Sequence, residues 1–110
     1  MQITDLLQLP QIQLHSTAAD LPAAVHTLCG LLAQGDAVQD AVLLEQDVLA
    51  RLAQGCICMG NGLAVPHAKT AAVRRAALAA ITLDKPIHCP TPDGEPVDLL
   101  FLIAAPEGEN

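Results

Sequence analysis

The chain has 110 residues, of which 52% are hydrophobic and 15% charged, and its formal net charge is −7. This is the length of one domain with enough apolar surface for a core, which excludes disorder caused by a lack of hydrophobic residues. An acidic balance argues against nucleic-acid binding, and no apolar run reaches the roughly 18 residues of a membrane span, so we expect no direct membrane insertion.

The first ten residues and the cysteines indicate the compartment. Residues 1–10 contain no basic residue ahead of a hydrophobic stretch, so they do not read as a secretory signal. Four cysteines without an export signal are typical of reduced thiols. The sequence therefore predicts a cytoplasmic protein.

Charge is divided unevenly along the chain. All five Lys and Arg residues lie between positions 51 and 85, while residues 1–50 and 86–110 carry six and five of the twelve acids. A local basic segment in an acidic protein favours a small anionic ligand or group, with a basic protein as partner. The alternative, that these charges are only solvated faces, is equally compatible with the pattern.

The first half of the chain predicts a strand followed by a helix. Ile12–Leu14 alternates and is a plausible edge strand. Asp20 is an N-cap candidate, and Pro22 suits the first helical turn. Apolar residues then recur at helical spacing, which predicts a helix over residues 21–34 that ends at Gly35.

A second helix should begin after Asp40 and end at Gly55. Its apolar stripe would consist of Val42, Leu43, Leu49 and Leu52.

Strands dominate the remainder. Leu63–Val65 is a short apolar strand, residues 69–75 suit a helical turn, and residues 76–83 and 97–104 read as buried strands. Helices followed by strands predict an α/β or α+β layer fold. Because residues 97–104 are apolar on both faces, either the two helices supply all the cover or the natural domain continues past Asn110.

His67 is the first candidate functional residue. It follows Pro66, which ends the short strand and places the next side chain at the rim of the sheet. A free imidazole is largely neutral at pH 7 and is then a good nucleophile. The alternative is a surface histidine in a turn.

The residues around His67 suit an anion. Gly60 and Gly62 can offer backbone N–H groups to phosphate oxygens, and the basic side chains of Arg51, Lys69 and Arg74 can neutralise charge. A neutral imidazole among such groups meets the needs of phosphoryl transfer to histidine.

Four stretches carry a family resemblance. Residues 58–70 read CMGNGLAVPHAKT and closely resemble the active-site stretch of the fructose/mannitol-type enzyme IIA domain of the bacterial phosphoenolpyruvate:sugar phosphotransferase system. Residues 1–7 resemble the family's opening, Arg51 with Gly55 its Arg-x-x-x-Gly approach to the site, and residues 92–108 its penultimate strand and turn. The similarity covers the whole chain, and the fructose-type branch looks nearest.

The resemblance implies a mechanism and its residues. His67 matches the phosphorylated histidine, through Nε2, and Arg51 matches the arginine near the phosphate. The loop beside the phosphate corresponds to Gly60, Asn61 and Gly62. Members accept the phosphoryl group from the phosphocarrier HPr and pass it to an enzyme IIB domain during sugar uptake, here of a fructose-like sugar. No metal or organic cofactor is implied.

The resemblance also implies an α/β fold, a mixed β-sheet with helices on both faces. The family continues beyond the stretch matched by residues 92–108, to a second active-site histidine and further helices. We therefore expect residues 1–110 to be one enzyme IIA domain that is incomplete at its C-terminal end, with the C-terminal helices missing. Oligomeric state is left open, a homo-oligomer included.

The match is imperfect in the loop before the site. Cys56-Ile57 stands where the family has Ser-Thr, and Cys58 stands where it has Gly. Hydroxyl donors are thereby lost, and losing one preorganised donor costs about 3–4 kcal/mol of transition-state stabilisation. We expect reduced transfer activity from this change and from the shortened chain.

Other readings remain. A regulatory, nitrogen-type enzyme IIA module would use phosphorylation of His67 to control protein partners, and a degenerate domain would transfer nothing. Cys56 and Cys58 with His88-Cys89 could be drawn as a zinc site, although their spacing is not the usual one. A thiolate nucleophile at Cys56 or Cys58 is a further alternative, whereas Cys29 fits a core position.

Overall fold

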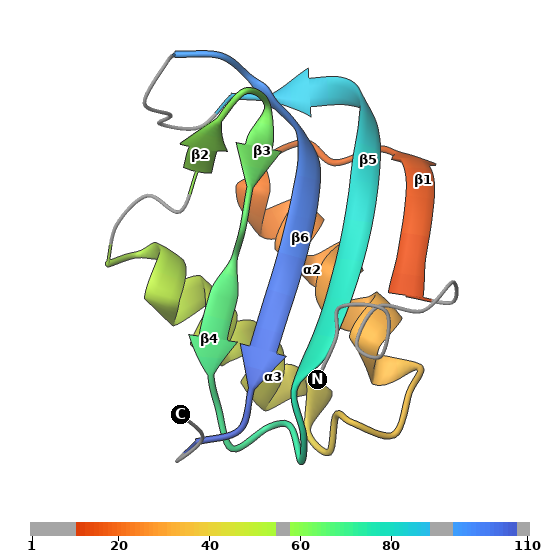
Figure 1. Cartoon of the computed structure of the whole chain (residues 1–110), viewed down its shortest axis with the longest axis vertical. Helices are drawn as coiled ribbons and strands as arrows, with labels where there is room; N and C mark the ends of the chain where they lie inside the picture. The colour runs from red at the N-terminus through yellow and green to blue at the C-terminus, as the bar shows by residue number, and fades with distance from the viewer. Residues whose placement is uncertain (1–10, 55–57, 89–93, 108–110) are drawn as a thin grey trace.

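The computed structural model describes residues 11–54, 58–88 and 94–107, and these form two helices and six strands (Figure 1). The elements are, in chain order, β1 (Ile12–Ser16), α2 (Leu21–Ala33), α3 (Ala41–Leu52), β2 (Cys58–Gly60), β3 (Leu63–Ala64), β4 (His67–Lys69), β5 (Ala77–Ile87) and β6 (Val97–Ala105).

The strands make one mixed sheet in the order β1-β5-β6-β3-β2. Strand β4 pairs with the same edge of β6 as β3 does, further towards the C-terminal end of β6. The long central pair, β5 and β6, is antiparallel, whereas β1 is parallel to β5 and both β3 and β4 are parallel to β6. The predicted α/β fold with a mixed sheet, and β1 as an edge strand, are confirmed. In the described part of the chain, both helices lie on the same face of the sheet (Figure 1).

Both helices begin after the N-cap residues that the sequence predicted, Asp20 and Asp40. The side chain of Asp20 accepts a hydrogen bond from the backbone N–H of Ala23, and that of Asp40 accepts one from Leu43, each at 3.0 Å. Each bond satisfies one of the orphan N–H groups of a first helical turn. Gly35 follows the C-cap of α2 as predicted, and its N–H donates to the carbonyl oxygen of Leu32 at 3.1 Å.

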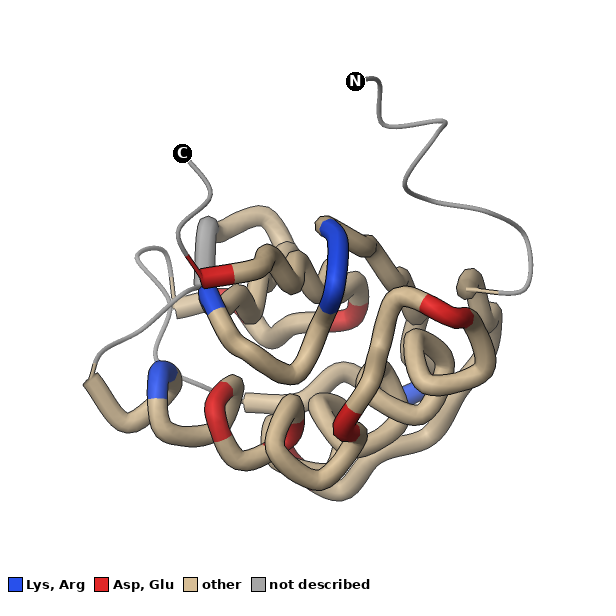
Figure 2. The backbone as a smooth tube through the Cα atoms, turned by 90° about the horizontal axis from the view of Figure 1, so that it is seen from below, with Lys and Arg blue, Asp and Glu red and all other residues tan. Residues whose placement is uncertain are grey.

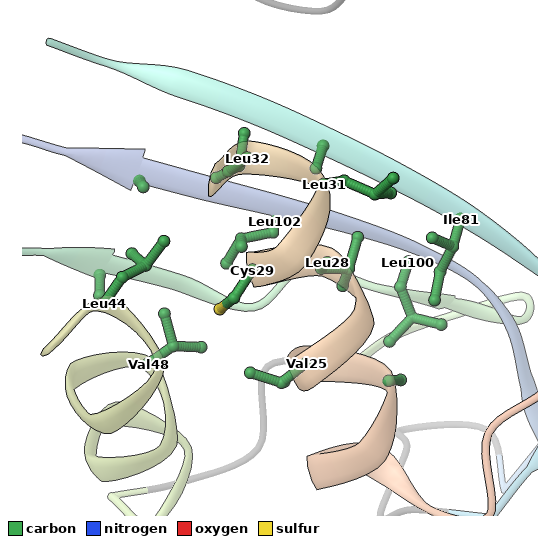
Figure 3. Close-up of a cluster of buried hydrophobic side chains, with 14 of the residues drawn as sticks. Val25, Leu28, Cys29, Leu31, Leu32, Leu44, Val48, Ile81, Leu100 and Leu102 are labelled. Atoms are coloured by element: carbon green, nitrogen blue, oxygen red, sulfur yellow. The ribbon is translucent and has the colours of Figure 1, made fainter. Parts of the chain in front are cut away.

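The core lies between the two helices and the covered face of the sheet (Figure 3). Each fully buried Leu or Ile side chain contributes about 1.5–3 kcal/mol through removal of apolar area from water. Cys29 is among these side chains, as predicted, and burial raises the pKa of its thiol to about 12, with Glu45 adding to the shift. The largest fully buried side chains include Leu28, Leu32, Leu44, Ile81, Leu100 and Leu102.

The opposite face of β6 is only partly covered in the described structure. Leu100 and Leu102 point to the helices and are fully buried, whereas Ile103 is 39% exposed and Phe101 is half-buried. On the neighbouring edge, Leu14 of β1 is 61% exposed. The apolar run of β6 is thus matched by helices on one face alone.

Two local predictions were wrong. Val42 is 68% exposed, because the buried face of α3 runs through Leu44 and Val48 instead. Residues 69–75 do not form a helical turn: β4 continues to Lys69, and the following segment pairs with the loop before α3 through a bridge between Val73 and Val38. This pairing satisfies backbone groups that a helical turn would have bonded internally.

The strands predicted over residues 76–83 and 97–104 are confirmed, and β5 is longer than expected because Ile87 still pairs with Val97. α3 ends at Leu52 with Ala53 as its C-cap, earlier than the end predicted at Gly55, which itself lies outside the described residues, as do residues 1–7. No helix within residues 11–54, 58–88 and 94–107 is both long and apolar enough to cross a bilayer.

Candidate functional site

His67 opens strand β4 and is exposed. The sequence predicted that the strand before it ends at Pro66 and places His67 at the rim of the sheet. Instead, the carbonyl oxygen of Pro66 accepts a hydrogen bond from the N–H of Ile103 at 2.9 Å, and His67 resumes parallel pairing with β6. Pro66 lacks an N–H but keeps its carbonyl, so it interrupts the ladder without ending it.

The imidazole of His67 is oriented by its own backbone. Nδ1 lies 2.9 Å from the carbonyl oxygen of Val65. A carbonyl can only accept, so Nδ1 must carry the proton and donate it. In the neutral ring the lone pair then resides on Nε2. The lone pair of Nε2 thus belongs to an exposed side chain, and no hydrogen bond to Nε2 is formed within residues 11–54, 58–88 and 94–107.

A cavity of about 210 Å³ lies between α3 and β4, and the two residues that follow His67 in the sequence, Ala68 and Lys69, line it. It brings together Arg51 from α3 and Lys69 from β4. His67 does not line this cavity, but it projects to the same side of β4 as Lys69, about 7 Å along the strand, because side chains alternate with period two. The lining residues are Asp47, Ala50, Arg51, Gln54, Ala68, Lys69 and Glu107.

The two cations of the cavity are free of ion pairs within the described residues, since the pairs formed there involve other side chains. Arg75, by contrast, is paired with Asp36, and this hydrogen bond and charge lower the pKa of the Asp36 carboxyl. Acidic and basic segments are interspersed over this part of the fold (Figure 2). The basic stretch of the sequence is therefore not one basic surface. Arg74, a predicted member of the anion site, is exposed and does not line the cavity, which Arg51 and Lys69 do.

The glycine turn that was predicted to bind the anion lies between β2 and β3, away from His67. Gly60, Asn61 and Gly62 join β2 to β3 with positive φ angles of 86°, 56° and 81°. A Cβ on Gly62 would come within 2.8 Å of the Asp98 carboxylate, which explains the glycine sterically. The pairing partner of Leu63 on β6 is Leu99, and that of His67 is Ile103.

Leu99 and Ile103 are four residues apart on β6, a distance of about 13 Å along the strand, so the structure does not bring the turn to His67. The Asp98 carboxylate beside Gly62 also makes that end of the sheet unfavourable for a phosphate.

Sequence reasoning missed three polar residues of the site, Asp47, Thr70 and Glu107. Asp47 and Glu107 line the cavity, and Thr70 is fully buried behind it. One signal was readable in advance, because Asp47 lies four residues before Arg51 and hence on the same helical face. The approach of Glu107 to β4 depends on the course of β6 and left no local signal.

The zinc-site and thiolate alternatives involve cysteines on either side of His67. Cys56, Ile57 and Cys89 lie outside the described residues, and Cys58 belongs to β2. In the part of the chain that the structure describes, no three His, Cys, Asp or Glu side chains gather closely enough to hold a metal ion.

With this geometry in view, comparison with known proteins gives a consistent result. Residues 5–110 match the family model of the phosphoenolpyruvate-dependent sugar phosphotransferase system, EIIA 2. The chain is 36% identical over 110 residues to the 2-O-alpha-mannosyl-D-glycerate-specific EIIABC component of Escherichia coli K12, and 32% identical over 110 residues to the fructose-specific EIIABC component of Bacillus subtilis 168. The matches cover 99% and 100% of this chain but 17% of each relative's length.

Regulatory proteins are equally similar. The nitrogen regulatory protein of Bradyrhizobium diazoefficiens is 34% identical over 112 residues, a match that covers 98% of this chain and 70% of that protein. Among solved structures, nitrogen regulatory protein IIA-Ntr from Neisseria meningitidis superposes with a TM-score of 0.87 at 28% identity, over 96% of this chain and 72% of the other.

Proposed function

Because the chain belongs to the EIIA 2 family of the phosphoenolpyruvate-dependent sugar phosphotransferase system, we propose that His67 Nε2 is its phosphoryl acceptor. In this proposal the chain takes a phosphoryl group from phospho-HPr in the cytoplasm. It passes the group to an enzyme IIB domain.

The observation that carries the proposal is the bond from His67 Nδ1 to the Val65 carbonyl. It fixes the tautomer in which Nε2 has the lone pair, and it restrains rotation of the ring. The nucleophile is then presented from an exposed side chain without a general base, because no proton has to leave Nε2 before attack.

The transfer step balances without a cofactor. The Nε2 lone pair forms a bond to phosphorus as the bond from phosphorus to the donor histidine nitrogen breaks, and that nitrogen keeps the electron pair. Charge on the three equatorial oxygens must be stabilised through this step. We assign that role to Arg51, whose planar guanidinium can bind two oxygens, and to Lys69, which acts as a point charge.

We give no such role to the turn of Gly60, Asn61 and Gly62, since about 13 Å or more of β6 separates its level from that of His67. This departs from the role implied by the family resemblance. Their conformations are accounted for by the β2–β3 reversal and by the contact with Asp98.

For the destination of the phosphoryl group, we propose sugar uptake with a fructose-like sugar. Similarity to the fructose-specific component, and to a component specific for a mannosyl glycerate, supports a transport role. A second candidate is regulation, in which phosphorylated His67 changes binding to a protein partner. The match to a nitrogen regulatory protein along 70% of its length, and the TM-score of 0.87 to another, favour this alternative.

The direct test is incubation of the chain with radiolabelled phosphoenolpyruvate, enzyme I and HPr, followed by mapping of acid-labile phosphate. We expect the label on His67 and its loss in His67→Ala. His26→Ala is the matched control, because His26 is an exposed histidine on α2 whose Nδ1 contacts Glu45 and which lies outside the site. Label that persists in His67→Ala would contradict the proposal.

The two destinations are separated by a second incubation. Labelled chain is mixed with an enzyme IIB domain of the fructose type and, separately, left without it. Loss of label to the IIB domain within the time in which phospho-HPr loads the chain supports transport. Label that stays on the chain in both mixtures favours the regulatory candidate.

A further inference from the structure

A buried hydroxyl links the helix and the strand that carry the site. Thr70 directly follows β4, is fully buried, and its Oγ1 donates to Oδ2 of Asp47 on α3 at 2.5 Å. The same Oγ1 accepts a hydrogen bond from the N–H of Ala72 at 3.0 Å. The N–H of Thr70 donates to the carbonyl oxygen of Ala105 at 2.8 Å, so the residue is also fixed to β6.

This bond acts between the two elements that supply the cations. Asp47 lies one helical turn before Arg51, and both line the cavity against β4. Thr70 lies one residue after Lys69. The bond from Thr70 to Asp47 therefore joins α3 to the end of β4 next to both cations.

The buried residues near this bond in the sequence are apolar. Ala68 of β4, Ala72 after it and Val48 of α3 all belong to the buried core. Apolar contacts between small residues tolerate sliding, whereas a short hydrogen bond to a carboxylate fixes distance and register. Removal of the Thr70 hydroxyl would also leave the buried N–H of Ala72 without its hydrogen-bond acceptor.

We infer that Asp47 and Thr70 are positioning residues that hold α3 against β4, so that Arg51 and Lys69 converge on the phosphoryl group. This inference rests on the proposed function of His67. Neither residue touches the reacting atoms in this scheme, and their effect reaches the phosphoryl group through the placement of Arg51.

The test compares Thr70→Val, which keeps the shape and removes the hydroxyl, with Thr70→Ser, which keeps the hydroxyl. At saturating phospho-HPr we expect Thr70→Val to be labelled about tenfold more slowly and Thr70→Ser within about twofold of the unaltered chain, since small misplacements of a stabilising group cost large factors in rate. Thr27→Val is the matched control, because Thr27 Oγ1 donates to the Ala23 carbonyl oxygen within α2 at 3.3 Å.

A double-mutant cycle separates positioning from general destabilisation. In an Arg51→Ala background, Thr70→Val should slow labelling by less than about twofold, because the group that it positions is already gone. A tenfold loss in both backgrounds would overturn the inference. If Thr70→Val does not fold, Asp47→Asn, which retains an oxygen acceptor, and Asp47→Ala supply the same contrast from the helix side.

A titration with inorganic phosphate, followed through the NMR signals of Arg51 and Lys69, keeps the inference distinct from the proposed function. Shifts that are present in the unaltered chain and in Thr70→Ser, but reduced in Thr70→Val, support positioning even if His67 takes no label. Equal shifts and equal labelling in all three chains would overturn the inference and leave the phosphoryl-acceptor role intact. Absence of label on His67 would overturn that role alone.

Discussion

The two edges of the sheet each present an exposed histidine whose Nδ1 is engaged, but the neighbouring cavities differ, since cations accompany the carboxylates in the one beside β4 and none does in the one beside β1. On β4, Nδ1 of His67 donates to a neutral carbonyl, and Arg51 and Lys69 share the adjacent cavity. On β1, Nδ1 of His15 lies 2.8 Å from the Asp84 carboxylate.

A pocket of about 560 Å³ beside His15 contains two carboxylates, Asp84 and Asp98, and no Lys or Arg. Carboxylates without a cation repel an incoming phosphoryl group there, whereas beside β4 Arg51 and Lys69 offset the charge of Asp47 and Glu107 and can contact the group. Exposure and a defined tautomer are therefore not sufficient for an acceptor histidine. The charges supplied by neighbouring elements make the distinction.

Backbone geometry separates the two sites as well. His15 has a φ of 57°, an unusual conformation for a residue other than glycine, at a register shift between Gln13 and Ser16. The N–H of His15 donates to Oγ1 of Thr82 at 2.9 Å, which helps to hold that conformation. His67 continues a regular ladder with β6. The β1 histidine thus lies at an irregular point of its strand and contacts a carboxylate, whereas the β4 histidine lies in a paired strand and contacts a backbone carbonyl.

The largest effect expected from this contrast is at Arg51. Arg51→Ala should slow labelling of His67 about 100-fold, since removal of one preorganised donor costs 10²–10³ in rate. Lys85→Ala is the matched control on the other side, because Lys85 follows Asp84 in β5 and is exposed. The measurement is the initial rate of acid-labile incorporation from phospho-HPr. Equal labelling rates in Arg51→Ala and Lys85→Ala would contradict the proposal that the charges beside β4 favour phosphoryl transfer.

A smaller effect is expected at Lys69. Lys69→Ala should slow labelling about tenfold, because a solvated point charge stabilises an anion less than a bidentate guanidinium does. Added salt should slow the unaltered chain more than Lys69→Ala, because screening acts on the charge that the variant lacks. Rates are compared at low and high salt. An unchanged salt dependence in the variant would exclude Lys69 from the anion site.

The smallest effect is expected at His15. Both His15→Ala and His15→Gly lose an exposed hydrogen bond to Asp84, worth about 0–1 kcal/mol, but only glycine relieves the positive φ, worth about 1–2 kcal/mol. His15→Gly should therefore be the more stable of the two by about 1 kcal/mol in urea unfolding. Labelling of His67 should be unchanged in both. A less stable glycine variant would contradict the strained conformation.

Local sequence signals located most elements. Asp20 and Asp40 as caps, the apolar spacing of α2 and the two long apolar runs were sufficient to predict both helices and the central strands, because each signal is satisfied within a few residues. Val42 shows the limit: it fits a helical stripe, but which stripe of α3 is buried depends on the surface against which the helix packs.

For the site, the sequence by itself determined His67 as a reachable imidazole after Pro66 and identified Arg51, Lys69 and Arg74 as its cationic candidates. The tertiary structure decided that Arg51 and Lys69 share a cavity without Arg74, and that the glycine turn lies at a different level of β6. It also decided that the Thr70 hydroxyl is bonded to Asp47 across 23 residues of sequence. Strand register and helix placement arise from contacts between distant residues, and no short motif encodes the distances that those contacts set.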